Sequence, residues 1–249
     1  MDLSKIYDPY KINARIKPAF LLFLPVVIFV IAFFEPSRTM EGIALTFLVS
    51  FGVIAFAANQ MSSRGNILQE KLYKKWGGAP TTIVCRHSDD TLDRPTKSRY
   101  MQHLAGLIKG FSVISETDEK NDPKAADEMY RSAANYVRER TRDQKKYSMI
   151  FNENIEYGFS RNLTACKPFG IVLTLICLVL CLLGLYHVIG VPLESLSLTD
   201  LTKHPYLVTA TGVELLIFLG WIFLVNHDWV RVRGLAYAKR LFESCEEVS

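Results

Sequence analysis

The 249-residue sequence lacks the short motifs by which many enzymes are recognised. It contains no Cys-x-x-Cys pair, no His-Glu-x-x-His, no Gly-x-Ser-x-Gly and no Walker-type phosphate loop. These absences argue against a zinc protease, a serine hydrolase and a P-loop nucleotidase. A catalytic or metal site built around Cys85, His87 and His103 stays open as an alternative. We expect that the chain is not an enzyme and holds no metal or cofactor.

Charged residues are scarce in four apolar blocks, which cover residues 19–34, 42–58, 169–189 and 206–225. Each block is 16 to 21 residues long. At roughly 1.5 Å of rise per residue, such lengths suit a hydrocarbon core of about 30 Å, with help from flanking residues in the two shorter blocks. The sequence therefore predicts a mainly α-helical membrane protein whose four spans form two transmembrane hairpins.

Lysine and arginine are nearly missing from the short loops inside the two hairpins. Arg38 is alone in the first loop and Lys203 in the second, whereas four basic residues precede the first block and four follow the last. Cytoplasmic loops of membrane proteins carry the excess of Lys and Arg. We therefore predict that both termini and the central segment lie in the cytoplasm.

The cysteines do not form the pattern of a disulfide framework. They fall in the central segment, in the third span and in the C-terminal tail, which are expected to face the cytoplasm or the bilayer. Free thiols are therefore expected at all five positions: Cys85, Cys166, Cys177, Cys181 and Cys245.

Neither a repeat nor a low-complexity linker interrupts the central polar segment. The predicted organisation is a basic segment and first hairpin over 1–58, a cytosolic domain over 59–167, a second hairpin over 168–225 and a cytosolic helix over 226–249. That last helix is expected to continue the fourth span. We therefore expect an ordered sensor domain inserted between the two hairpins.

The start of the cytosolic domain is expected to prolong the second span as a helix that ends at Gly77. Two β-branched or apolar stretches, 80–86 and 111–115, favour strands, and residues 94–110 favour a helix that begins with Pro95 near its start. These elements together predict a small α/β unit.

A helical stalk is predicted after this unit. Asp122 suits the N-cap of a helix with Pro123 at its first position, and that helix could run to Cys166, interrupted or bent near Gly158. It would enter the third span across Pro168 and pair with the extended second helix. The stalk would then join the cytosolic domain to the membrane.

A basic cluster near the start of the cytosolic domain is the first candidate site. Guanidinium groups and free N–H groups at helix starts hold phosphates, so a nucleotide or short oligonucleotide is a candidate ligand. A solvated surface, paired locally with aspartates, is the alternative. The cluster consists of Arg86, His87, Arg94, Lys97 and Arg99.

A second basic cluster is predicted on one face of the stalk helix. Arg131, Arg138, Arg142 and Lys145 are spaced by seven, four and three residues, as neighbours on one helix face are. We consider three roles for them: lining an anion-binding site, attraction to anionic lipid headgroups, and a plain solvated stripe.

Glu214 is the acidic residue of the fourth apolar block. A charged carboxylate at mid-membrane depth costs at least roughly 2.5 kcal/mol, so it normally has a partner or a function. Thr211 on the same helix and Thr174 on the third span are candidate neighbours. Helix packing, a polar ring that lines a pore formed by several copies, and transport are the alternatives.

Three stretches, "KLYKKWGGAPTT", "RHSDDTLDRPTKSRY" and "NIEYGFSRNLTACKPFG", resemble bacterial inner-membrane effectors of antiphage defence. The arrangement of spans is similar to that of the membrane-channel effector of Hailong systems, in which an oligonucleotide signal opens an oligomeric channel. The resemblance implies an anionic ligand, a location in the bacterial inner membrane and a homo-oligomer, with a tetramer favoured.

The function expected from these features is a pore that a nucleotide or oligonucleotide opens and that depolarises the membrane. The alternatives are a non-conducting membrane scaffold, which recruits a soluble partner encoded nearby, and a membrane-bound enzyme.

Overall fold

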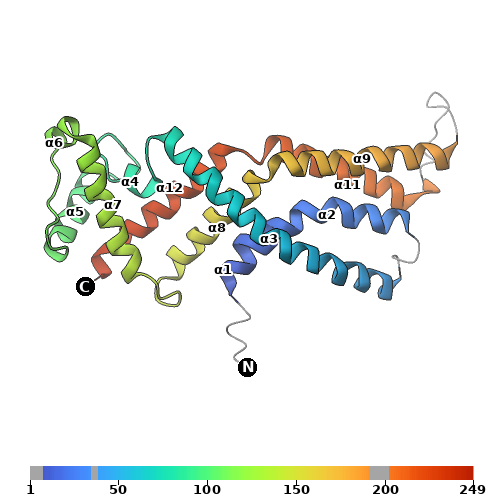
Figure 1. Ribbon diagram of the computed structural model, residues 1–249, viewed down its shortest axis with the longest axis horizontal. Coiled ribbons are helices and arrows are strands. Elements are labelled where there is room, and N and C mark those ends of the chain that lie inside the picture. Colours follow the sequence, from blue (N-terminus) through green and yellow to red (C-terminus); the bar gives the residue numbers. More distant parts are fainter. Residues whose placement is uncertain (1–7, 35–38, 191–201, 249) are drawn as a thin grey trace. The chain divides into compact units, whose positions relative to one another are not determined.

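The computed structural model describes residues 8–34, 39–190 and 202–248, without the side chains of residues 46, 47, 50 and 51 (Figure 1). All regular elements in these ranges are helices, and none is a strand. The predicted mainly α-helical class is therefore confirmed for this part of the chain, whereas the α/β unit is wrong.

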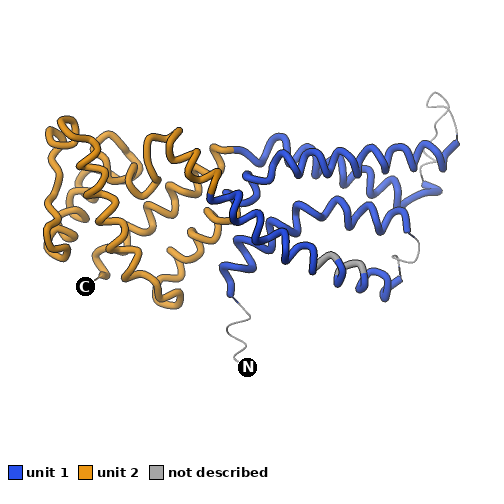
Figure 2. The backbone as a smooth tube through the Cα atoms, in the orientation of Figure 1, with its two compact units in different colours: residues 1–66, 161–226 blue, residues 67–160, 227–249 orange. Residues whose placement is uncertain are grey.

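The chain divides into two compact units, each assembled from segments far apart in the sequence (Figure 2). Unit 1 contains residues 1–66 and 161–226, and unit 2 contains residues 67–160 and 227–249. Helices α3 (Met40–Trp76) and α8 (Ser148–Ala165) contribute residues to both units.

Unit 1 holds the long apolar helices. A short helix α1 (Pro9–Lys11) and one π-helical stretch η2 (Ile12–Ile16) lead into α2 (Lys17–Phe33), and α9 (Lys167–Ile189) and α11 (Pro205–Phe223) come from the second hairpin. Residues 9–33, α9 and α11 are long and apolar enough to cross a membrane. The chain is therefore a multi-pass membrane protein, as predicted.

The second predicted span, residues 42–58, lies in the first part of α3. It is helical, as expected, and its described side chains are largely exposed, among them Leu48 and Phe56. Three candidate spans are found among the described residues. A membrane crossing by residues 42–58 stays a prediction.

Helices α2, α9 and α11 pack against one another because two glycines of α9 allow close approach. A Cβ atom added at Gly170 would lie 2.3 Å from Cε2 of Trp221, and one added at Gly184 would lie 2.4 Å from Cζ of Phe33. Both distances are far below van der Waals contact. Glycine is therefore required where these aromatic rings cross α9.

Unit 2 is built from short amphipathic helices around one core. Its helices are α4 (Pro80–Ile83), α5 (Arg94–Leu107), α6 (Glu116–Asn121), α7 (Pro123–Arg140) and α12 (His227–Glu243), followed by a 3-10 turn η5 (Cys245–Glu247). Fully buried side chains of its main core include Leu104, Tyr130, Val137, Leu241 and Phe242.

The two predicted strands are wrong for different reasons. Pro80 begins α4, because its fixed φ suits the first position of a helix, and Thr81, Thr82 and Ile83 are buried against other helices. Burial has thus overridden the β preference of branched side chains. Residues 111–115 form no regular element, and no described segment pairs with them as a neighbouring strand.

The predicted stalk helix begins where expected but ends early. Asp122 Oδ1 accepts a hydrogen bond of 3.0 Å from Ala125 N, which caps α7. The helix stops at Arg140, where the Thr141 hydroxyl donates to the Val137 carbonyl. A turn separates α7 from α8, and α8 passes through Gly158 without interruption. An interruption at Gly158 is therefore wrong, whereas a bend there stays a prediction.

Helix α8 does connect and pair as the sequence predicts. It ends at Ala165, and one residue, Cys166, separates it from α9, which has Pro168 in its first turn. Within unit 2, the Tyr157 hydroxyl of α8 lies 3.2 Å from Gln69 Oε1 and 3.1 Å from the Tyr73 hydroxyl on α3. The pairing of the extended second helix with this part of the stalk is confirmed.

The C-terminal helix is separate from the fourth span. Helix α11 ends at Phe223 and α12 begins at His227, so α12 is not its continuation. Lys167 Nζ binds carbonyl oxygens at the end of α11, those of Ile222 at 2.9 Å and Val225 at 2.7 Å. These bonds satisfy carbonyls that a longer helix would have used. All five cysteines are free and buried, as predicted for the thiols.

Candidate functional site

An open pocket of about 650 Å³ lies in unit 2, between the chain after α4, the start of α5, α6 and the start of α7. Five of its lining residues carry basic side chains and three carry acidic ones. The charged and titratable lining residues are Arg86, His87, Arg94, Glu116, Glu119, Lys120, Lys124 and Asp127. The pocket is therefore polar and of mixed charge.

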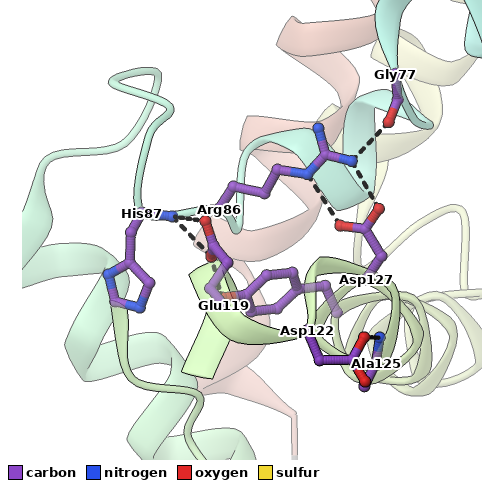
Figure 3. Close-up of polar contacts among 8 residues, drawn as sticks. Gly77, Arg86, His87, Glu119, Asp122, Ala125 and Asp127 are labelled. Carbon is purple, nitrogen blue, oxygen red and sulfur yellow. Dashed lines mark hydrogen bonds and ion pairs between the residues drawn. The ribbon is translucent and has the colours of Figure 1, made fainter. Parts of the chain in front are cut away.

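Arg86 forms one wall of the pocket and is already paired (Figure 3). Its Nε and Nη2 donate to the two carboxylate oxygens of Asp127 at 2.9 and 2.6 Å, and Nη2 also donates to the Gly77 carbonyl at 2.6 Å. The hydrogen bond with Asp127 raises the pKa of Arg86. This bidentate ion pair holds the side chains of Arg86 and Asp127 in place at the pocket wall.

Glu119 ties the loop after α4 to α6 and α7. Its two carboxylate oxygens accept from His87 N at 3.0 and 3.2 Å, and Oε2 accepts from the Tyr130 hydroxyl at 2.6 Å (Figure 3). Burial and the bond to Glu119 raise the pKa of Tyr130, so this hydroxyl stays a donor. His87 Nε2 lies 2.9 Å from the Ile114 carbonyl oxygen, so we assign the ring proton to Nε2. Nδ1 then remains to accept a hydrogen bond.

Arg94 and Lys124 are the pocket cations that form no ion pair with any described residue. Lys120 differs from them because its Nζ lies 2.7 Å from Glu116 Oε1. Arg94 is in the first turn of α5 and Lys124 in the first turn of α7. The pocket therefore holds two cations without an ion pair at two helix starts, and its four Arg and Lys side chains exceed its three carboxylates by one.

Lys97 and Arg99 of the first predicted cluster have other roles. Lys97 is 4% exposed, and its Nζ donates to the carbonyl oxygens of Arg86 at 2.5 Å and Asp89 at 2.6 Å. Arg99 Nε lies 2.6 Å from Glu246 Oε1. Only Arg86, His87 and Arg94 of that cluster line the pocket.

The second predicted cluster does not lie on one helix face. Helix α7 carries Arg131 and Arg138 but ends at Arg140, so Arg142 and Lys145 belong to the following turn. All four predicted side chains are exposed, and Arg138 donates to Asn135 Oδ1 at 3.0 Å. The spacing argument fails because it assumed a helix that continues.

Sequence reasoning missed α6, Lys120, Lys124 and the acidic residues that pair with the basic ones. A local signal was present: Ser115 Oγ accepts from Asp118 N at 3.1 Å and donates to Asp118 Oδ2 at 2.6 Å. A serine followed three residues later by an acidic residue is typical of a helix start. No comparable local signal pairs Arg86 with Asp127, which lies 41 residues away.

Cys85 belongs to the alternative catalytic or metal site, and it has the features of a structural thiol. Cys85 is 1% exposed, and its Sγ donates to the Thr81 carbonyl at 3.3 Å. Burial raises the pKa of Cys85 well above the ordinary thiol value. A reactive cysteine needs the opposite shift. Among the described residues, no group of three His, Cys, Asp or Glu side chains is arranged to hold a metal ion.

Glu214 lies inside unit 1. It is 0% exposed, and neither carboxylate oxygen has a hydrogen-bond partner among the described residues. Thr174 is also 0% exposed, and its hydroxyl likewise has no partner there. The third predicted polar residue, Thr211, is half-buried and donates to the Leu207 carbonyl at 2.8 Å. The Glu214 carboxylate is therefore not exposed on the surface of the single chain.

Comparisons with protein-family models, with curated proteins and with solved structures find no match. The chain is a multi-pass membrane protein for which no family is identified. The expectation of an antiphage channel thus rests on the sequence resemblance and on the two sites described above.

Proposed function

We propose that this protein is a ligand-controlled membrane effector. Unit 2 binds a nucleotide or short oligonucleotide in the pocket beside Arg94 and Lys124, and the membrane helices of several copies form a pore that depolarises the membrane in antiphage defence. The two unpaired cations in a preformed pocket are the single observation that carries the proposal.

The pocket has the size and chemistry for such a ligand. A volume of about 650 Å³ falls within the usual range for small-molecule sites. Phosphate oxygens would accept from the side chains of Arg94 and Lys124. Glu116 and Glu119 line the same pocket and can accept from ligand hydroxyl or amino groups. A ligand that carries phosphate together with hydroxyl or amino groups would therefore bind both the basic and the acidic lining residues.

Binding would be tested with full-length protein in detergent, titrated separately with ATP, a short oligoadenylate and inorganic pyrophosphate. We expect Arg94→Ala and Lys124→Ala each to weaken binding about tenfold, the equivalent of roughly 1.4 kcal/mol. Lys109→Ala is the matched control, because Lys109 is an exposed lysine that does not line the pocket. Equal binding by all three variants, or no binding of any probe, would refute the ligand site.

Conduction would be tested separately, with the protein in liposomes that contain a potential-sensitive dye. The probe that binds should collapse an imposed potential, and Arg94→Ala should need a correspondingly higher probe concentration. Binding without a change in potential would favour the scaffold over the pore.

A further inference from the structure

The carboxyl group of Glu214 is buried among apolar helices without compensation. It is 0% exposed, and both of its oxygens lack hydrogen-bond partners among the described residues. Isolated buried carboxylates are so costly that they normally become neutral instead. Something other than a side chain of the described residues must therefore balance this group.

The face of α9 near Glu214 is polar but carries no cation. Thr174, Cys177 and Cys181 are spaced by three and four residues, which places them on one side of α9, and all three are buried. Cys177 and Cys181 are the buried titratable groups of α9.

The other helices of unit 1 supply no compensating charge. Helix α2 has no titratable side chain after Lys17, and in α11 the other titratable residue is Tyr206 at the start. In α9, Lys167 binds carbonyls at the end of α11, and His187 is exposed. Among the described residues, no charged side chain forms a hydrogen bond or an ion pair with Glu214.

A metal cation does not fit this donor set. Hard cations require several oxygen ligands, whereas no polar atom of the described residues forms a hydrogen bond with the Glu214 carboxylate. Soft metals would need a cluster of thiolates or imidazoles, and no such cluster is found among the described residues. A proton needs a single oxygen.

We propose that Glu214 is a reversible proton-binding site within unit 1, so that proton uptake from water controls the charge held between α9 and α11. This inference goes beyond the ligand pocket of unit 2 and stands without it. Its test reads protonation, not ligand binding or conductance, so the failure of one proposal leaves the other intact.

The experiment uses dicyclohexylcarbodiimide, an apolar reagent that adds to a protonated carboxyl group. The carboxylic O–H adds across one C=N bond, and rearrangement gives an N-acylurea that retains all atoms of both reactants. Full-length protein in detergent would be treated from acidic to alkaline pH and analysed by peptide mass spectrometry. We expect labelling of Glu214 that decreases as pH rises and that is lost in Glu214→Gln.

Glu41→Gln is the matched control, because Glu41 is an exposed acid at the start of α3 and its loss should leave the labelling of Glu214 unchanged. Sodium chloride and choline chloride would be compared at equal concentration. Protection by sodium alone would replace the proton with a sodium ion as the occupant and overturn the proposal.

Infrared difference spectra of the wild type minus Glu214→Gln provide a second measurement that needs no reagent access. A protonated carboxyl group gives a C=O stretching band that disappears on ionisation. We expect this band at acidic pH and its loss as pH rises. A band absent at every pH, or present unchanged at every pH, would overturn reversible proton binding.

Discussion

Two buried ionisable side chains, Lys97 in unit 2 and Glu214 in unit 1, have opposite surroundings. Lys97 is 4% exposed and donates to two backbone carbonyls, whereas Glu214 is 0% exposed and has no partner for either oxygen among the described residues. A buried charged group with hydrogen-bond partners holds those partners in place. A buried ionisable group without partners indicates that a ligand or a proton is bound there. Burial alone therefore does not distinguish a structural residue from a functional one.

The largest effect should come from Lys97→Met, which keeps an apolar stem and removes the charge. The carbonyls of Arg86 and Asp89 would lose their donor, and we expect unit 2 to lose about 3 kcal/mol of stability. Hydrogen exchange of α5 and α7 peptides in the full-length protein would measure this. Lys109→Met, at an exposed position, should change stability by less than about 0.5 kcal/mol. Equal effects of the two variants would show that the Lys97 bonds contribute nothing.

Glu214→Leu should have a smaller effect of opposite sign. Removing a buried carboxyl group that has no hydrogen bond removes its desolvation cost, so we expect a gain of about 1 to 2 kcal/mol. Thermal unfolding in detergent, followed by tryptophan fluorescence, would detect a higher Tm. A clear loss of stability would mean that Glu214 has a stabilising partner, and the contrast with Lys97 would disappear.

The smallest effect concerns an exposed charge in unit 2. Asp93 caps α5, and the hydrogen bond of 2.9 Å from Thr96 N lowers the pKa of Asp93. Because the folded-state pKa is the lower one, this stabilisation is present above the ordinary aspartate value of about 4 and is lost as pH falls through the folded value. Asp93→Ala should therefore lower the Tm at neutral pH but not in strong acid.

The control for this pH dependence is Asp90→Ala, which removes a neighbouring exposed aspartate that caps no helix. Its Tm should match that of the wild type at both pH values. A Tm loss for Asp93→Ala that persists unchanged in strong acid would exclude the charged cap as its cause.

Local signals in the sequence predicted several elements correctly. Pro95 lies near the start of α5, and Asp122 with Pro123 begins α7, both as expected, because a cap and a proline act within one helical turn. The strand predicted at residues 80–83 is wrong. These residues form a helix, because their burial against other helices outweighs the preference of branched side chains for strands.

The candidate sites were predicted only in part. Arg86, His87 and Arg94 do line the pocket, but Lys97 and Arg99 have internal partners. Charge along a sequence shows that a segment is basic, not which cations are already neutralised. That depends on residues that approach only after folding, such as Glu246 beside Arg99.

The sequence by itself determined the apolar lengths of the membrane helices, the helix caps and the presence of an acid within an apolar block. These properties follow from local backbone chemistry and from transfer of side chains out of water. The tertiary structure decided that Glu214 is enclosed without a partner while Lys97 is enclosed with two. The physical reason is that desolvation and hydrogen bonding of a side chain depend on which distant segments pack around it.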